Sequence, residues 1–212
     1  MIGLFGGTFD PVHWGHLRLA TRVQRELKLS EIRWIPLNQA VHKDQPIADA
    51  AQRVSMVQAA IQDNPGFCID TCELRRGGPS FMVDTLTDIQ ASLPDETFCL
   101  IVGADALAHF SKWKQPQRIL QLAHIVGVQR PGCAFNPPPW LAAHCCTRVA
   151  DLHQQTAGLI YQQTMTPSTL ASTTIRQALI EQRDVQTMLP TPVLAFIQHH
   201  NLYRPNTSPN PC

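Results

Sequence analysis

Two histidines near the start of the chain stand three residues apart and among glycines. The segment holding them is GGTFDPVHWGH, residues 6–16, which follows an apolar run and precedes a helical pattern. Glycines let backbone N–H groups approach a ligand closely, and a helix N-terminus carries about half a positive charge. As imidazolium groups, His13 and His16 could donate hydrogen bonds to phosphate oxygens and offset charge that develops during phosphoryl transfer. The segment therefore predicts a phosphate site.

Other interpretations of this histidine pair stay open at this point. The pair could simply cap a helix, or it could bind a metal, although no third ligand stands at an informative spacing. The segment contains neither G-x-G-x-x-G nor G-x-x-x-x-G-K-[ST]. It therefore lacks the fingerprints of the dinucleotide-binding dehydrogenases and of the P-loop proteins.

Short apolar runs alternate with helical patterns along the whole chain. In the first helix, Leu17, Ala20, Val23 and Leu27 fall close to one face of a 3.6-residue period. Several strand runs are apolar almost throughout, as strands covered on both faces should be. This alternation predicts an α/β fold with a doubly wound parallel sheet. We expect strands at 2–6, 32–37, 67–71, 97–102, 124–128 and 159–162, and helices at 15–28, 48–63, 80–92, 116–122, 173–182 and 191–199.

Two further segments carry residue types that suit phosphate. Asn38, His42 and Lys43 follow the second expected strand and can meet an anionic ligand. Ser172 and Thr173 lie at the start of a later helix, and Arg176 lies in its first turn. Hydroxyl caps, free N–H groups and a rigid guanidinium fork would together bind phosphate oxygens. Taken alone, the first segment is more often an ordinary polar loop, and the second is more often an ordinary helix cap.

Polar groups also follow two other elements. The glycines at 77 and 78 end a loop, and Ser80 is the expected N-cap of a helix whose free N–H groups near Met82 could bind a carboxylate. Gly103 and Asp105 come after the fourth expected strand, where the carboxylate could accept hydrogen bonds from ribose hydroxyls. An ordinary capped helix and an ordinary turn would look the same in isolation.

The first segment resembles the signature of the nucleotidylyltransferase superfamily, whose members carry H-x-G-H after the first strand. In full, GGTFDPVHWGH resembles the family of bacterial nicotinate-nucleotide adenylyltransferases. Later segments match that family in order, at 38–43, 73–86, 101–107 and 170–176, so the resemblance covers nearly the whole chain. The departures are Ala40 and Val41 in place of prolines, Phe81 and Met82 in place of Tyr and Thr, and Ala171 in place of a hydroxyl residue.

The resemblance implies a Rossmann-like nucleotidylyltransferase fold and the conversion of ATP and nicotinate mononucleotide to nicotinate adenine dinucleotide and pyrophosphate, a step of NAD biosynthesis. It implies Mg²⁺ bound mainly through ATP phosphates, and no metal site made by the protein. It makes His13, His16 and Arg176 catalytic and places the indole of Trp113 on the pyridine ring. The implied ATP contacts are Gly6, Gly7, Thr8, Phe9, His13, His16, Gly103, Asp105, Ser172, Thr173 and Arg176, and the implied mononucleotide contacts are Asn38, His42, Lys43, Met82, Thr85 and Trp113.

Three alternative functions remain after this comparison of motifs. A sister transferase could use nicotinamide mononucleotide or another phosphorylated acceptor. A regulator could bind ATP without turnover, although His13, His16 and Arg176 argue against it. A metal-dependent phosphohydrolase could use the histidines, but the sequence offers it no clear Asp and His ligand set.

Composition limits the remaining classes. The 212 residues suit one domain over 1–203, with a helical part at about 172–203 and a disordered tail at 204–212. Lys and Arg number 17 against 16 Asp and Glu, which gives no support for nucleic-acid binding. No run of about 18 apolar residues predicts a membrane span. Seven irregularly spaced cysteines without a C-x-x-C pair favour reduced thiols in a cytoplasmic protein. We expect the protein to be either a monomer or a homodimer.

Overall fold

The computed structural model describes residues 1–41, 45–129, 135–165 and 170–204. Seven strands form one sheet in the order β3-β2-β1-β4-β5-β7-β6, and every neighbouring pair is parallel. This arrangement confirms the predicted doubly wound α/β fold. The strands are β1 (Ile2–Gly7), β2 (Glu31–Pro36), β3 (Phe67–Ile69), β4 (Phe98–Gly103), β5 (His124–Gln129), β6 (Cys145–Cys146) and β7 (Ile160–Thr164).

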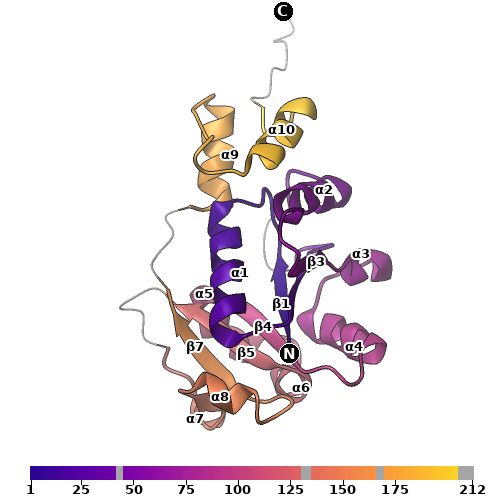
Figure 1. Cartoon of the computed structure of the whole chain (residues 1–212). Coiled ribbons are helices and arrows are strands. Elements are labelled where there is room, and N and C mark those ends of the chain that lie inside the picture. The colour runs from indigo at the N-terminus through magenta and orange to yellow at the C-terminus, as the bar shows by residue number, and fades with distance from the viewer. Residues whose placement is uncertain (42–44, 130–134, 166–169, 205–212) are drawn as a thin grey trace, which may run out of the picture.

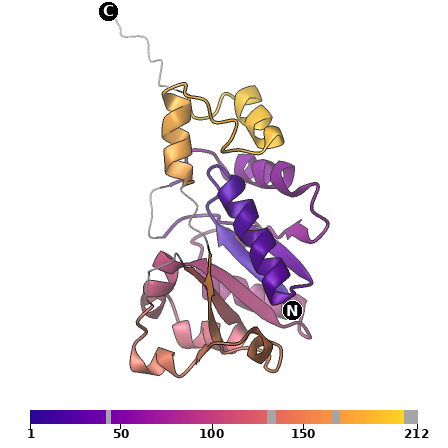
Figure 2. The ribbon, with the colours of Figure 1, turned by 60° about the vertical axis from the view of Figure 1, so that its left-hand side comes forward.

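Helices cover both faces of the sheet, as Figures 1 and 2 show from two sides. One apolar core receives residues from α1, α2, α8, α9 and α10, and the other receives residues from α3, α4, α5, α6 and α7. The helices are α1 (Trp14–Leu27), α2 (Ala50–Ile61), α3 (Cys72–Arg76), α4 (Met82–Ser92), α5 (Ala104–Ala108), α6 (Pro116–Leu122), α7 (Pro139–Ala142), α8 (Val149–Leu152), α9 (Ser172–Ile180) and α10 (Thr191–His199), with a 3₁₀ turn η1 at Phe110–Lys112.

Strand side chains alternate between the two cores. On β4, Cys99 and Ile101 belong to the core under α1, whereas Phe98, Leu100 and Val102 belong to the core under α4. Successive side chains of a strand point to opposite faces, so a strand buried on both sides must be apolar at almost every position. The nearly continuous apolar runs in the sequence therefore correspond to the central strands.

The shortest elements escaped the sequence prediction. Strand β6 and helices α3, α5, α7 and α8 span two to five residues, which is too short for a periodic pattern to develop. The expected helix at 48–63 begins later, at Ala50, because the carboxylate of Asp49 accepts a hydrogen bond from the N–H of Gln52 and caps it. The sequence thus placed the long helices and strands correctly, with their ends displaced by a few residues.

The order of the sheet fixes where a ligand can bind. From β1 the chain first builds β2 and β3 on one side and then crosses to β4 on the other side. Ligands of open α/β sheets bind outside the carboxyl ends of the strands at such a switch point. Here those ends are Gly7 of β1 and Gly103 of β4, which belong to the predicted site.

Helices α9 and α10 lie beyond this edge of the sheet, next to the start of α1 (Figure 1). Helix α10 packs against α2, and the core under α1 includes Ile197 and Tyr203 as well as Phe5. The predicted helical part at 172–203 is therefore built onto the same core. Of the predicted tail at 204–212, residues 205–212 lie outside the described part. None of the described helices has the length and apolar character of a bilayer span.

A buried arginine joins two of the loops at the carboxyl edge. Arg53 of α2 is only 1% exposed, and its guanidinium donates hydrogen bonds to the carbonyls of Thr8 at 2.9 Å and Leu37 at 2.6 Å, and more weakly to that of Ala48. These carbonyls lie in the segments that follow β1 and β2. Burial lowers the pKa of Arg53, and the charge of Asp10 opposes this shift. The side chain therefore holds the two strand-end loops together.

Replacing Arg53 with Ala should lower the free energy of unfolding by about 3 kcal/mol, because buried carbonyls lose their donor and Asp10 loses a neighbouring charge. Urea unfolding followed by circular dichroism measures this loss. The matched change Arg118→Ala, at an exposed arginine, should cost less than about 0.5 kcal/mol. Equal small losses for both variants would contradict the assigned role.

Candidate active site

The turn after β1 is closed by an aromatic ring. Phe9 has a φ of 51°, a left-handed conformation that bulky residues rarely adopt, and it is only 2% exposed. A Cβ atom on Gly7 would lie 2.7 Å from the Phe9 ring, so the turn requires glycine there. The Phe9 ring contacts Phe5 and Trp34 beneath the turn. Phe9 was expected to line the ATP site, and its ring supports the turn from the core.

His13 and His16 lie together at the N-terminus of α1. Their rings stack with centroids 3.8 Å apart. Nδ1 of His13 accepts the N–H of Gly15 at 3.1 Å, and Nδ1 of His16 accepts the N–H of His13 at 3.3 Å. The pair thus forms a reciprocal capping box, in which each ring satisfies a backbone donor of the first turn. The capping interpretation is confirmed, and it leaves the other ring nitrogens available.

These hydrogen bonds fix which nitrogen carries the proton. Burial lowers the pKa of His13 to about 4, and burial together with the neighbouring His13 lowers the pKa of His16 well below its usual value. Both rings are therefore neutral near pH 7, and the predicted imidazolium groups are corrected for the free protein. Because each Nδ1 accepts a hydrogen bond, the proton of each neutral ring lies on Nε2. The pair presents two N–H donors that an anion could use.

Helix α9 approaches the same turn. Its first residue, Ser172, donates from its hydroxyl to the carbonyl of Pro11 at 2.9 Å, and Arg176 donates from Nη1 to the carbonyl of Asp10 at 2.6 Å. The helix begins one residue earlier than expected, and its N-cap residue Ala171 makes no side-chain capping bond. The predicted hydroxyl cap is therefore absent. Instead, Ser172 and Arg176 join α9 to the loop before His13.

The carboxylate of Asp10 lies at the centre of this loop. It is 3% exposed and accepts hydrogen bonds from the N–H groups of Ile47 at 2.9 Å and Ala48 at 3.1 Å, and from the hydroxyl of Tyr203 at 2.6 Å. No role was predicted for Asp10 or Tyr203. Arg53 was also missed, although it occupies a core-facing position of α2 beside Met56 and Val57. An arginine on an apolar helical face is the signal that could have identified it.

A second group of predicted residues surrounds the start of α4. Asn38 donates from its side-chain amide to the carbonyl of Gly78 at 2.9 Å, and its N–H donates to the hydroxyl of Ser80 at 3.0 Å. Ser80 is therefore not the N-cap; Phe81 occupies that position and makes no side-chain capping bond. A Cβ atom on Gly6 would lie 3.1 Å from the methyl group of Met82. The start of α4 thus reaches the turn after β1.

Thr85 does not lie on the surface of this site. It is fully buried, and its hydroxyl donates to the carboxylate of Glu73 at 2.7 Å and accepts from Arg76 at 3.1 Å. Its side chain therefore ties α4 to α3, whereas the predicted contact with the mononucleotide was expected from the backbone near Met82 and Thr85. Glu73 also lies 3.4 Å from the N–H of Asn38, so the same carboxylate joins α3 to the segment after β2.

Trp113 is half-buried at the edge of the core under α4. Its ring contacts Phe110 at 5.6 Å between centroids, and it packs on the same core as Phe81 and Met82. Next to it, Lys114 forms an ion pair with Asp84 at 2.9 Å and lies 4.4 Å from the centroid of the Phe81 ring. An aromatic side chain and a cation therefore flank the first turn of α4.

Of the other predicted site residues, some are exposed at the same edge of the sheet and two lie outside the described part of the chain. Gly103 and Asp105 are exposed at the carboxyl end of β4, and a Cβ on Gly103 would meet open space. Thr8 is partly exposed on the turn after β1, and Thr173 is exposed within 3.5 Å of Arg176. His42 and Lys43 lie outside the described residues. Within the described ranges, no three His, Cys, Asp or Glu side chains group to hold a metal ion, which gives no support to the phosphohydrolase alternative.

The fold and this site define a nucleotide-binding α/β protein whose glycine turn, helix N-terminus and paired histidines meet at the switch point of a parallel sheet. The chain belongs to the cytidylyltransferase-like family, whose profile matches residues 4–178. The family relationship predicted from the H-x-G-H segment is thereby confirmed.

Two curated relatives and one solved structure are similar to this chain over nearly its whole length. A protein of Methylococcus capsulatus named "Probable nicotinate-nucleotide adenylyltransferase" is 44% identical over 209 residues, covering 96% of this chain and 99% of that one. A protein of Aeromonas hydrophila with the same name is 38% identical, covering 96% and 97%. The solved structure of Plasmodium falciparum nicotinic acid mononucleotide adenylyltransferase complexed with NaAD superposes with a TM-score of 0.73 at 15% identity, covering 95% and 96%, and it confirms the fold.

The buried state of His13 predicts how stability depends on pH. A folded pKa of about 4 lies below the unfolded value of 6.5, so the unfolded chain binds a proton first as the pH falls. Stability present above pH 6.5 should therefore be lost progressively toward pH 4, by about 3 kcal/mol from this residue. His13→Asn keeps an N-cap oxygen without a titrating group and should show a smaller loss between pH 7.5 and pH 5 in urea unfolding.

The same substitution at His199, which is exposed at the end of α10, controls for a change in charge alone. It should leave the pH dependence of unfolding as in the wild type. An identical pH dependence in His13→Asn and wild type would show that His13 is not buried in its neutral form.

Proposed function

We propose that this chain transfers the adenylyl group of ATP to nicotinate mononucleotide, which yields nicotinate adenine dinucleotide and pyrophosphate for NAD biosynthesis. The observation that carries the proposal is the stacked His13–His16 pair, whose Nδ1 atoms are bound by backbone N–H groups and whose Nε2–H groups remain as donors. The names of the relatives support the choice of acceptor.

The reaction needs no nucleophile from the protein. A 5′-phosphate oxygen of the mononucleotide attacks the α-phosphorus of ATP in line, and a new oxygen–phosphorus bond forms there. The bond from the α-phosphorus to the bridging oxygen breaks, and pyrophosphate leaves with the electron pair. A phosphate monoester is already ionised near pH 7, so the protein acts by positioning and by charge stabilisation.

The phosphates are assigned to the turn after β1 and to α9. In this assignment the backbone of Gly6, Gly7 and Thr8 lines the turn, while Nε2–H of His13 and of His16 donates to phosphate oxygens. Arg176 uses Nη1 on the carbonyl of Asp10, and Nε and Nη2 are assigned to the β- and γ-phosphates. Nη2 also lies 3.5 Å from the hydroxyl of Thr173, which belongs to the same site. Neutral donors held by the backbone need no reorganisation when charge develops on the transferred group.

The rest of the nucleotide contacts are assigned by position. Phe9 shapes the turn, Ser172 and Thr173 present the start of α9, and Gly103 with Asp105 serves the adenosine at the end of β4. Mg²⁺ enters as part of the MgATP substrate and offsets charge on the triphosphate. The donor set agrees with this, because rings protonated on Nε2 and bonded through Nδ1 have no free lone pair for a metal.

The pyridine carboxylate is assigned to the first turn of α4. Among the described residues the N–H groups of Met82 and Val83 have no hydrogen-bond acceptor, and Phe81 leaves this helix end uncapped. A carboxylate at a helix N-terminus gains about 0.3–1 kcal/mol, and up to about 2 kcal/mol when partly buried, which a neutral amide largely lacks. Hydrogen-bond matching to the carboxylate supplies the rest of the preference. Lys114 offsets the charge of Asp84 beside this position. Trp113 stacks on the ring, Asn38, His42 and Lys43 contact the mononucleotide, and Thr85 supports α4 from the core.

We also propose that residues 1–203 act as one domain and that the reaction takes place in the cytoplasm. One core joins Phe5 of β1 to Tyr203 after α10, which supports a single unit. The five described cysteines are free thiols, as a reducing compartment requires.

His16→Ala should lower kcat by at least roughly a hundredfold, because one donor to the transferred phosphoryl group is lost. His199→Ala, at an exposed histidine of α10, should keep wild-type turnover. Steady-state pyrophosphate release measures both variants. Near-normal turnover in folded His16→Ala would remove this residue from the mechanism.

The acceptor is tested by offering nicotinate mononucleotide and nicotinamide mononucleotide separately with MgATP. We expect pyrophosphate release to be at least about tenfold faster with the acid at equal, subsaturating concentration, and mass spectrometry should identify the dinucleotide. Preference for the amide would keep the chemistry and reject the carboxylate site at α4. ATP binding without turnover of either compound would favour the regulator alternative.

A further inference from the structure

The end of the described chain reaches back to the loop before the histidines. Tyr203 follows α10 and is 4% exposed, and its hydroxyl donates to Oδ1 of Asp10 at 2.6 Å. The two residues are 193 positions apart in the sequence. Burial and the bond to Asp10 both raise the pKa of the Tyr203 phenol, so it remains a protonated donor. A buried donor on a buried carboxylate is a strong and directional contact.

The backbone of Tyr203 adopts a conformation that its residue type disfavours. Its φ is 56°, in the left-handed region that few bulky residues occupy. Such a conformation persists only where the surrounding contacts outweigh its cost, and it is concentrated at functional positions. The chain therefore accepts local strain in order to bring this hydroxyl to Asp10.

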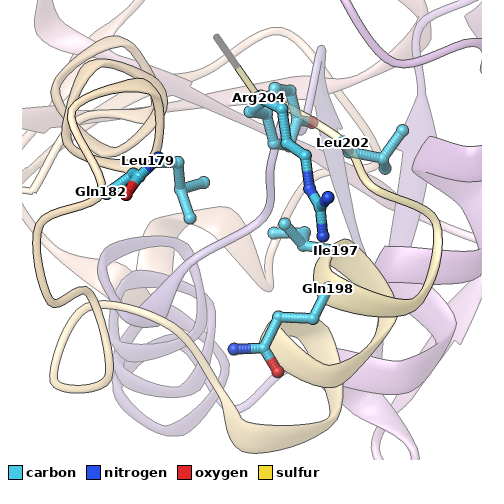
Figure 3. Close-up of a pocket in the computed structure, with 7 residues that line it drawn as sticks. Leu179, Gln182, Ile197, Gln198, Leu202 and Arg204 are labelled. Atoms are coloured by element: carbon cyan, nitrogen blue, oxygen red, sulfur yellow. The ribbon is translucent and has the colours of Figure 1, made fainter.

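Apolar packing in the core under α1 and the hydrogen bond to Asp10 both hold Tyr203 in this place. The seam between α9, α10 and residues 202–204 contains an open pocket of about 330 Å³, and Figure 3 shows the side chains that line it. Leu179, Ile197 and Leu202 contribute its apolar wall. The seam is open on this side, and the hydrogen bond to Asp10 is the polar contact that joins Tyr203 to the loop before His13.

Asp10 transmits this contact to Arg176. The guanidinium Nη1 of Arg176 bonds to the main-chain carbonyl of Asp10 at 2.6 Å and lies 3.7 Å from its carboxylate Oδ2. The carboxylate itself is oriented by the N–H groups of Ile47 and Ala48 and by Tyr203. A shift of Asp10 would move both of the oxygen atoms that position Arg176, its main-chain carbonyl oxygen and Oδ2.

We propose that Tyr203 is a positioning residue for nucleotide binding, whose hydroxyl holds Asp10 so that Arg176 presents its remaining nitrogens to the triphosphate. The proposal rests on the proposed function, because it takes Arg176 to be a phosphate-binding residue. It assigns Tyr203, which follows α10, a part in a site formed by the turn after β1 and the start of α9.

The test is a double-mutant cycle between Tyr203→Phe and Arg176→Ala in the full chain. Tyr203→Phe keeps the ring and removes only the hydroxyl, and it should lower kcat/KM for ATP by roughly tenfold, the size of one hydrogen bond to a charged group. The KM for the mononucleotide should change less than about twofold, because its carboxylate is assigned to the first turn of α4, away from Arg176. In the Arg176→Ala background, Tyr203→Phe should have no further effect.

Tyr161→Phe is the matched control, because Tyr161 is the other tyrosine of the chain and lies on β7 away from Asp10. The kcat/KM for ATP of Tyr161→Phe should match that of the wild type. Asp10→Asn, which keeps the side-chain shape but removes the charge, should reproduce the loss of Tyr203→Phe and should likewise add nothing to Arg176→Ala. Thermal unfolding confirms that each variant is folded at the assay temperature.

Titration calorimetry with a non-hydrolysable ATP analogue provides a readout that does not depend on turnover. Weaker binding by Tyr203→Phe that disappears in the Arg176→Ala background supports the proposal even if the wild type transfers no adenylyl group. A wild type that binds the analogue but transfers no adenylyl group would reject only the proposed function. The proposal is overturned if Tyr203→Phe weakens binding by the same factor with and without Arg176, or if it has no effect on binding.

Discussion

The carboxylate of Asp10 is buried, and a buried charge is costly unless hydrogen bonds surround it. Here backbone N–H groups from the segment before α2 and the hydroxyl of Tyr203 meet that requirement. Arg53, also buried, adds a balancing charge and binds the carbonyls of the neighbouring loops. Satisfying this one ionised group therefore brings together segments that follow β1, β2 and α10, and the site is formed where they meet.

The paired histidines show how one set of atoms serves both folding and chemistry. Capping the first turn of α1 uses Nδ1 of each ring and so determines the tautomer of each neutral ring. Burial keeps both rings uncharged near pH 7 before a ligand arrives. A stacked pair of imidazolium groups would repel, whereas two neutral donors can share a small space.

The departures at Phe81 and Met82 look less severe in three dimensions than in the sequence. A site made of backbone N–H groups does not depend on which side chain follows the N-cap, because every residue other than proline supplies the same donor. Met82 instead fills space beside Gly6, and Phe81 lies under the ammonium group of Lys114. The hydrogen bond from Thr85 to Glu73 gives this buried hydroxyl a structural role, because it ties α4 to α3.

The sequence by itself determined the long elements, the parallel sheet and the glycine-containing turn after β1. These features arise from local periodicity and from glycines and histidines that are close together in the chain, so a linear pattern can carry them. Only the tertiary structure decided that the histidines are neutral, that Ser80 binds Asn38 rather than capping α4, and that Thr85 is buried. It alone revealed Asp10, Arg53 and Tyr203 as partners, because burial and hydrogen bonds between residues up to 193 positions apart depend on how the chain folds, which no local pattern records.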